Sequence, residues 1–145
     1  MEDDFSRGSN ILVFKDDSFQ EVLIQKRSME KKRSPGKFCT PGGSLKFDET
    51  HIDGAKREFF EEMFNSGKID DSFKFEKLFE IDKTKNEHIE VFRTVSKGPF
   101  SPDPKEVEGA FFENISILME KINESPENYT STTRLLLKEY KKRYM

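Results

Sequence analysis

Residues 43–62 of this 145-residue chain read GSLKFDETHIDGAKREFFEE, and this stretch decides both the fold and the chemistry. Its second half repeats apolar residues at intervals of three and four, which predicts a helix over 50–64. Asp48 or Thr50 would serve as the N-cap of that helix. We expect the apolar side of the helix to face the core through Ile52, Ala55, Phe59 and Met63.

The polar side of the predicted helix carries Glu58, Glu61 and Glu62, at positions i, i+3 and i+4. These side chains emerge from one helical turn, and each like-charged pair costs roughly 0.2–0.5 kcal/mol. Taken alone, the pattern is typical of a solvated acidic helix face. A divalent cation would remove the repulsion, and Mg²⁺ prefers oxygen ligands of this kind.

Two features upstream of the glutamates favour the metal site over the solvated face. The run Pro41-Gly42-Gly43 offers bare backbone near the helix entrance, where N–H groups can receive phosphate. Glu49 lies between these glycines and the three glutamates. A glycine turn, a carboxylate and a helix with three carboxylates together fit a site for a metal and a diphosphate.

The same segment resembles the signature of the Nudix hydrolases, G-x5-E-x7-R-E-U-x-E-E-x-G-U, in which U is a bulky apolar residue. Gly43, Glu49 and the run 57–62 match it at the correct spacing. The later glycine and the last apolar position of the signature fall on Phe64 and Asn65. We therefore expect the helix to end differently here, with Gly67 as its cap.

Three further segments, 22–28, 86–92 and 106–112, look like the Nudix branch that includes isopentenyl-diphosphate isomerase and its hydrolase-like relatives. In that branch a glutamate ahead of a later strand joins the metal or acid–base set, and Glu87 matches it better than Glu90. The isomerases have a cysteine–glycine–histidine run before the signature. This chain has Gly42-Gly43-Ser44 there, and Cys39 lies three positions too early, so we expect a hydrolase.

The resemblance implies a Mg²⁺-dependent enzyme, with Mn²⁺ as a possible substitute, that cleaves a diphosphate linkage. The substrate would be a nucleoside diphosphate-linked or related small molecule. Glu58 and Glu62 would hold the metal, Glu61 would be a ligand or the base, and Glu87 an extra ligand or base. The sequence does not fix which glutamate is the base.

Two motif residues are expected to be structural: Arg57 would pin a carboxylate by a bidentate pair, and Glu49 belongs to the same motif. Phosphate or substrate would be held by Gly42, Gly43, Arg27, Lys37 and Arg93. For each of the three cations an ordinary solvated side chain is the competing interpretation.

Two alternative functions remain open. Phe64 in place of the signature glycine favours a non-catalytic module that binds a diphosphate or nucleotide through a degenerate box. The second alternative is an isomerase-like enzyme acting on an allylic diphosphate, which the missing cysteine disfavours.

The order of elements predicts a single Nudix domain over residues 1–145, with a flexible polar start over 1–9. Its expected fold is an α/β/α sandwich of the mixed α+β type with a mixed central sheet. Periodicity predicts strands over 10–15, 19–25, 38–40, 73–81, 89–95 and 110–112, and further helices over 115–122 and 130–144. Loops are expected at 26–37, which is basic, and at 97–105, which is rich in proline.

Composition excludes several classes of protein. Charged residues make up 37% of the chain, and no apolar run is long enough to span a bilayer. The acidic N-terminus is unlike a signal peptide, and the single cysteine favours a reducing compartment, so we predict a cytoplasmic protein. A net charge of −3 argues against nucleic acid as the partner. A homodimer is possible for such a small sheet.

Three residues with reactive side chains receive structural interpretations. Neither His51 nor His88 has a partner at metal-ligand spacing along the sequence, so both are expected to be ordinary structural histidines. Cys39 is expected to be a small buried residue in a strand.

Overall fold

The protein is described here from a computed structural model, which covers residues 6–145; residues 1–5 of the predicted flexible start lie outside the described part. The strands are β1 Ser6–Phe14, β2 Glu21–Arg27, β3 Phe38–Cys39, β4 Gly42–Ser44, β5 Glu76–Thr84, β6 Glu87–Val95 and β7 Val107–Asn114. The helices are α1 His51–Phe64, α2 Ile115–Glu124 and α3 Ser131–Tyr144, with a short 3₁₀ turn, Pro126–Asn128, between the last two.

The strands form one mixed sheet, as predicted, in the order β3-β2-β1-β6-β5, with β4 paired to β1 and β7 to β2. β1 and β6 run parallel in continuous register, and the other pairs are antiparallel. β1 and β2 share only the register pair Phe14↔Val22, and beyond it β1 pairs with β4 while β2 pairs with β3. The two central strands therefore separate along the sheet.

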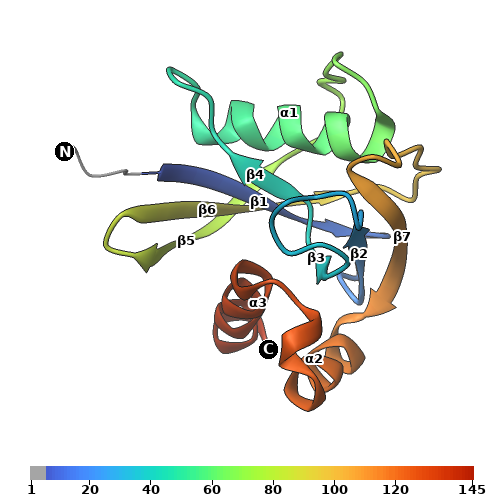
Figure 1. Ribbon diagram of the computed structural model, residues 1–145, viewed down its shortest axis with the longest axis vertical. Helices are drawn as coiled ribbons and strands as arrows, with labels where there is room; N and C mark the ends of the chain where they lie inside the picture. The colour runs from blue at the N-terminus through green and yellow to red at the C-terminus, as the bar shows by residue number, and fades with distance from the viewer. Residues whose placement is uncertain (1–5) are drawn as a thin grey trace.

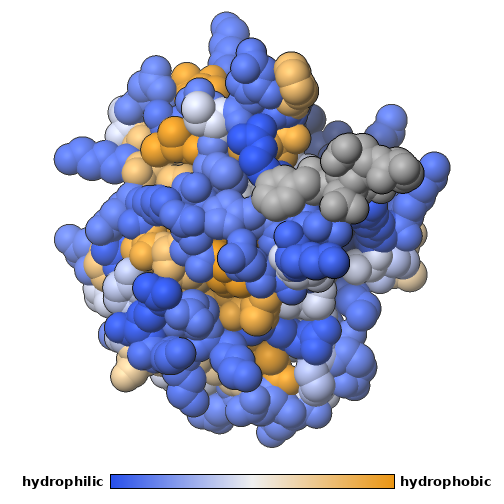
Figure 2. Space-filling model, turned by 90° about the vertical axis from the view of Figure 1, so that its left-hand side faces the viewer, coloured by the Kyte–Doolittle hydropathy of each residue, from blue (hydrophilic) through white to orange (hydrophobic). Residues whose placement is uncertain are grey.

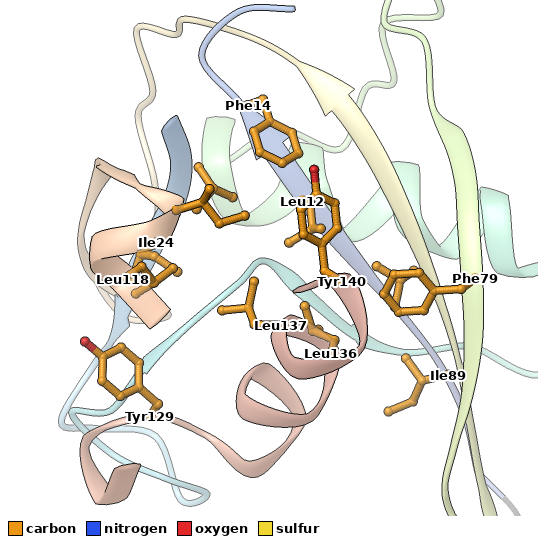
Figure 3. Packing of buried hydrophobic residues seen from close by; sticks show 13 residues of the cluster. Leu12, Phe14, Ile24, Phe79, Ile89, Leu118, Tyr129, Leu136, Leu137 and Tyr140 are labelled. Atoms are coloured by element: carbon orange, nitrogen blue, oxygen red, sulfur yellow. The ribbon is translucent and has the colours of Figure 1, made fainter. Parts of the chain in front are cut away.

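Helix α1 covers one face of the sheet, and α2 and α3 cover the other (Figure 1). The alternation of β1 explains this three-layer arrangement, because successive side chains point to opposite faces. Ile11 and Val13 belong to the core under α1, whereas Leu12 and Phe14 belong to the core under α2 and α3. All four side chains are fully buried. Figure 3 shows the second of these cores, where Leu136, Leu137 and Tyr140 of α3 reach the sheet.

Helix α1 begins as the sequence predicts and ends differently. The Thr50 side chain accepts a hydrogen bond from the Asp53 backbone N–H, which is the expected N-cap contact. The C-cap is Asn65, in the left-handed conformation at φ 50°, so the expected cap at Gly67 is wrong. Asparagine tolerates this conformation better than most residues, because its short polar side chain bonds locally.

The aromatic packing around α1 shows that the prediction of which residues face the core is partly wrong. Ile52, expected in the core, is 37% exposed, whereas Phe60 is buried. The segment between α1 and β5 explains the burial of Phe60. Phe73 in this segment packs against Phe60, with 5.2 Å between the ring centroids, and also against Phe64. Phe60, near the end of the helix, is therefore covered by aromatic side chains, whereas Ile52 in the first turn is open to solvent.

Three strand boundaries also differ from the predictions. Residues 6–9 belong to β1 instead of a loose terminus, and Ser9 there is fully buried. Residues 42–44, expected as a turn, pair with β1 as a short strand. Residues 73–75 precede β5 as a loop. In the described part of the chain, no helix combines the length and the apolar character needed to cross a membrane.

Candidate active site

A polar cavity of about 410 Å³ opens where β1 and β2 separate. Its walls come from β1, β2, β4 and α1, from the start of β6, from the loop at 31–34, and from the N-terminus of α3 at 130–132. Among the residues expected to form the site, the cavity is lined by Arg27, Gly42, Gly43, Glu58, Glu62 and Glu87. Cys39 and His88, which were expected to be structural, also line it. The structure therefore brings together most of the expected site from four separate segments.

Glu62 lies on the inner side of α1, against the sheet. Its Oε1 accepts a hydrogen bond of 2.7 Å from Gln25 Nε2, and the Gly42 backbone N–H lies at 3.5 Å. Burial, and after it the negative charge of Glu58, raises the pKa of Glu62 to about 8. This carboxyl group therefore gives up its proton reluctantly unless a positive charge arrives.

Glu58 lies one turn earlier on α1 and rests on the glycine strand β4. A Cβ atom at position 43 would lie 1.6 Å from Glu58 Oε2, so only glycine leaves room for this carboxylate. Burial raises the pKa of Glu58 to about 7, although the neighbouring Arg57 partly offsets this effect. Glu58 and Glu62 are therefore two desolvated carboxyl groups that repel each other beside a bare backbone.

Arg57 joins α1 to the loop that precedes it. Its Nε and one terminal nitrogen donate to the two oxygens of Glu49 at 2.8 and 2.9 Å, which is a bidentate pair. The same nitrogen donates to the Ser44 carbonyl, and the other terminal nitrogen donates to Glu58 and Glu61. These bonds from Arg57 hold the pKa of Glu49 down at about 2. The helix and the glycine strand are thereby fixed relative to each other.

Three of the expected site residues lie apart from the cavity lining. Glu61 is exposed, pairs with Arg57 at 3.2 Å and also lies beside Glu58. Lys37 is in the loop after β2 and does not line the cavity. Arg93 pairs with Glu76 and stacks on Phe19, with its guanidinium carbon 3.8 Å from the ring centroid. The position of a cation in a strand gives no information about which face it occupies, and β6 turns Arg93 toward a different hollow.

The cavity also contains residues that sequence reasoning missed. Gln25 donates a hydrogen bond to Glu62. Its one indication in the sequence was a polar side chain at the end of the apolar run 22–24. Glu106 pairs with Lys31 across 2.5 Å, and both line the cavity together with Lys83. Lys31 and Glu106 come from different loops and Lys83 from β5, and no local pattern connects them.

The acidic residues of the cavity fit a divalent cation. Arg57 bonds Oε1 of Glu58 only, so Oε2 is left facing Gly43. Glu62 accepts its one strong hydrogen bond from the neutral amide of Gln25. Cations such as Arg27 and Lys31 also line the cavity, but among the described residues only Arg57 forms a salt bridge with Glu58, and none forms one with Glu62. Hard oxygen ligands in such a position suit Mg²⁺.

Comparison with known proteins places the chain in a family. The sequence model of the NUDIX domain matches residues 5–134, and the chain therefore belongs to the NUDIX domain family. No curated protein matches the sequence. The fold resembles that of DR0079 from Deinococcus radiodurans, with a TM-score of 0.80 and 20% identity over 92% of this chain and 82% of that one.

Two further solved structures share the fold at lower identity. The MutT protein from Methanosarcina mazei Go1 has a TM-score of 0.69 and 16% identity, over 98% of this chain and 96% of that one. The E. coli dihydroneopterin triphosphate pyrophosphohydrolase has a TM-score of 0.65 and 14% identity, over 92% and 93%. These likenesses establish the fold. They give no support to the branch that includes isopentenyl-diphosphate isomerase.

Proposed function

We propose that this protein is a Mg²⁺-dependent hydrolase that cleaves the diphosphate linkage of a nucleoside diphosphate-linked or related small molecule. The observation that carries the proposal is the pair Glu58 and Glu62, two half-buried carboxyl groups with raised pKa values beside Gly42 and Gly43 in one cavity. The NUDIX family and the Nudix hydrolases among the similar structures support a hydrolase.

Each residue of the cavity has a distinct task in this proposal. Glu58 and Glu62 hold Mg²⁺, for which Mn²⁺ can substitute. When bound, the cation supplies positive charge to the phosphate oxygens and polarises phosphorus. Arg27 contacts a phosphate oxygen from the end of β2, and the bare backbone at residues 42–43 allows the phosphates to approach closely. Gln25 fixes the orientation of Glu62 through its amide N–H.

The proton of the attacking water needs an acceptor, for which two carboxylates are candidates. Glu87 lines the cavity from the start of β6. Glu61 lies on the outer side of α1 and would have to leave Arg57 to reach the cavity. Location therefore favours Glu87 over Glu61. General-base assistance of this kind is typically worth about 10²–10⁴-fold in rate.

The direct test replaces the two metal-holding groups by their neutral isosteres. Glu58→Gln and Glu62→Gln should each abolish Mg²⁺-dependent release of phosphate or nucleoside monophosphate from a panel of nucleoside diphosphate-linked compounds. Both variants should keep the fold in circular dichroism, because the raised pKa values show that an uncharged group is tolerated at these positions. The matched control is Glu120→Gln on the exposed side of α2, which should leave turnover unchanged. Undiminished turnover in either active-site variant would refute the mechanism.

A second candidate function is a non-catalytic module that binds a diphosphate or nucleotide. Phe64 favours it, because this residue replaces the signature glycine and belongs to the aromatic packing around the end of α1, stacking on Phe60 at 5.6 Å. Such a module would gain thermal stability from a nucleotide diphosphate and Mg²⁺ without forming any product. Product formation that depends on Glu58 rules this function out.

The isomerase-like alternative needs a reactive thiol, and the single cysteine of the chain, Cys39, lines the cavity from outside the position that the isomerases use. Burial raises the pKa of this thiol to about 11, and Gln25 donates a weak hydrogen bond to the sulfur at 3.6 Å. The group is therefore a protonated thiol at neutral pH. Exchange of deuterium from solvent into isopentenyl diphosphate would support this alternative over the hydrolase.

A further inference from the structure

A second group of metal-ligating side chains lies at the β5–β6 end of the molecule. His51 begins α1, and His88 and Glu90 lie on β6. One ligand atom from each of the three lies within 4.8 Å of the other two. Figure 2 views the molecule from this end, where most of the surface is hydrophilic. The two histidines, expected to be isolated, are therefore neighbours, with their ring centroids 5.5 Å apart.

The strand register explains why these groups meet. In the antiparallel pair of β5 and β6, Glu80 lies opposite Glu90 and Asp82 lies opposite His88. The alternate residues of the same strands, including Phe79 and Ile89, belong to the core under α3. The polar set therefore faces α1. There the buried Ser9 hydroxyl donates to the His51 carbonyl at 2.7 Å and fixes the start of the helix.

The distances suit a small tetrahedral ion. Glu90 Oε2 lies 3.2 Å from His51 Nδ1 and 4.0 Å from His88 Nε2. Ligands about 2.0–2.2 Å from a tetrahedral ion lie roughly 3.3–3.5 Å from each other, which falls between these two values. Glu80 Oε1 lies 2.9 Å from His88 Nε2 and provides a fourth oxygen within reach.

A carboxylate behind the ring orients His88. Asp82 Oδ1 lies 2.8 Å from Nδ1 of His88, which is the outer carboxylate contact common to metal-binding histidines. A proton on Nδ1 would complete this contact and leave Nε2 to face Glu90 and Glu80. The buried Nε2 of His51 has no hydrogen-bond partner among the described residues, so that ring lacks the full set of contacts of a structural histidine.

The two glutamates of the group already attract a cation. Lys77 Nζ lies 2.5 Å from Glu80 Oε2 and 3.4 Å from Glu90 Oε1. These are the other oxygens of the two carboxylates, and the lysine side chain is 44% exposed. Lys77 can therefore withdraw into solvent when a doubly charged ion takes its place.

We propose that His51, His88 and Glu90, with Glu80 as the fourth ligand, bind a divalent transition ion of the Zn²⁺ type. Imidazole nitrogens combined with carboxylate oxygens select such borderline ions, whereas the all-oxygen pair Glu58 and Glu62 suits Mg²⁺. The ion would connect the first residue of α1 to the β5–β6 hairpin. It would stabilise the fold whether or not the protein is a hydrolase.

The chain contains only two histidines, which makes the proposal directly testable by NMR. Zn²⁺ is titrated into the full chain in excess Mg²⁺ while the carbon-bound ring protons are recorded. Both histidines should respond together and saturate at one equivalent, and the melting temperature should rise. The Glu58→Gln/Glu62→Gln double variant should behave in the same way, because it lacks only the proposed Mg²⁺ ligands. Zn²⁺ that moves one histidine or neither overturns the proposal.

Variants separate a metal site from a network of ion pairs. His88→Gln and Glu90→Gln should each weaken Zn²⁺ binding at least tenfold, and Asp82→Asn should weaken it about 10–100-fold. Lys77→Met should strengthen binding, because it removes the competing cation. Glu120→Gln is the control and should leave the affinity unchanged. If the group only forms ion pairs, Lys77→Met does not strengthen Zn²⁺ binding and His88→Gln leaves Zn²⁺ affinity as it was, and either result refutes the site.

Discussion

Gly43 shows most directly how a single residue shapes the cavity. A Cβ atom there would lie 1.6 Å from Glu58 Oε2 and 2.8 Å from its carboxyl carbon, so the carboxylate must move. The three atoms nearest to this Cβ all belong to the side chain of Glu58 and not to the backbone. We therefore expect Gly43→Ala to fold normally but to lose about 100-fold in Mg²⁺-dependent turnover, since a displacement of about 1 Å can cost that much. Steady-state kinetics and a thermal melt measure the two effects.

Gly67 provides the matched control for this substitution. A Cβ atom at Gly67 would meet nothing within 4 Å, so Gly67→Ala should change neither turnover nor melting temperature. Full activity in Gly43→Ala would mean that the position of the Glu58 carboxylate is irrelevant to turnover. The role proposed for Glu58 would then be wrong.

The residues of the cavity were predictable where they share one short segment. Spacing alone places Glu58 and Glu62 on one helical turn, and the glycines precede that helix in the sequence. The contact between Gln25 and Glu62 joins residues 37 positions apart, and no local pattern reveals it. Charge was a poor guide, because Arg93 and Lys37 carry the expected sign and lie outside the cavity lining.

At the scale of elements, Arg57 connects α1 to the glycine strand and the loop before the helix. A lysine has one ammonium group and cannot reach both oxygens of Glu49, the Ser44 carbonyl and Glu58 together. We expect Arg57→Lys to lower the free energy of unfolding by about 1–3 kcal/mol. Turnover should fall as well, because α1 carries the proposed metal ligands. Urea denaturation and kinetics measure both effects.

Arg143→Lys on α3 is the control for this loss. Arg143 contacts Glu139 in one exposed i,i+4 pair, and such pairs contribute only about 0.3–0.5 kcal/mol. Its stability should therefore stay close to that of the unchanged chain. Equal losses in the two variants would show that Arg57 is an ordinary surface cation.

Most elements follow from local periodicity, whereas their pairing does not. Apolar spacing of three and four predicts all three helices, because each must bury one stripe against the sheet. β4 was missed because Gly42-Gly43-Ser44 has no side chain typical of a strand, and the pairing with β1 comes from outside the segment. The separation of β1 from β2, which creates the cavity, is likewise a property of the whole sheet.

At the scale of the whole molecule, the three-layer fold places two carboxyl groups with raised pKa values in a single cavity. The central strands are apolar on both faces, so the polar groups that must be buried gather where β1 and β2 separate. Glu58 and Glu62 reach this region from α1 and keep raised pKa values there. The cytoplasmic location and the homodimer stay predictions of the sequence.

This arrangement makes stability depend on pH in a direction that can be worked out. Glu58 and Glu62 hold protons in the folded state up to about pH 7 and 8, whereas in the unfolded chain they release them near pH 4.5. The folded state therefore binds more protons between these limits, and the free energy of unfolding should fall as pH rises from 5 to 8 without divalent ions. Burial lowers the pKa of His51, which acts in the opposite direction up to about pH 6.5. Glu49, with its pKa near 2, contributes only below pH 4.5.

Two comparisons isolate the contribution of the carboxyl pair. Glu62→Gln removes the group with the higher pKa, so its stability should decline less between pH 5 and 8 than that of the unchanged chain. Mg²⁺ should raise the melting temperature more at pH 8 than at pH 6, because it binds only the deprotonated carboxylates. Thermal melts across this range, with Mg²⁺ or with a chelator, measure both effects. A decline that is the same in Glu62→Gln, together with no response to Mg²⁺ at pH 8, would place both carboxyl groups in ordinary solvent and remove the basis for a cation at this site.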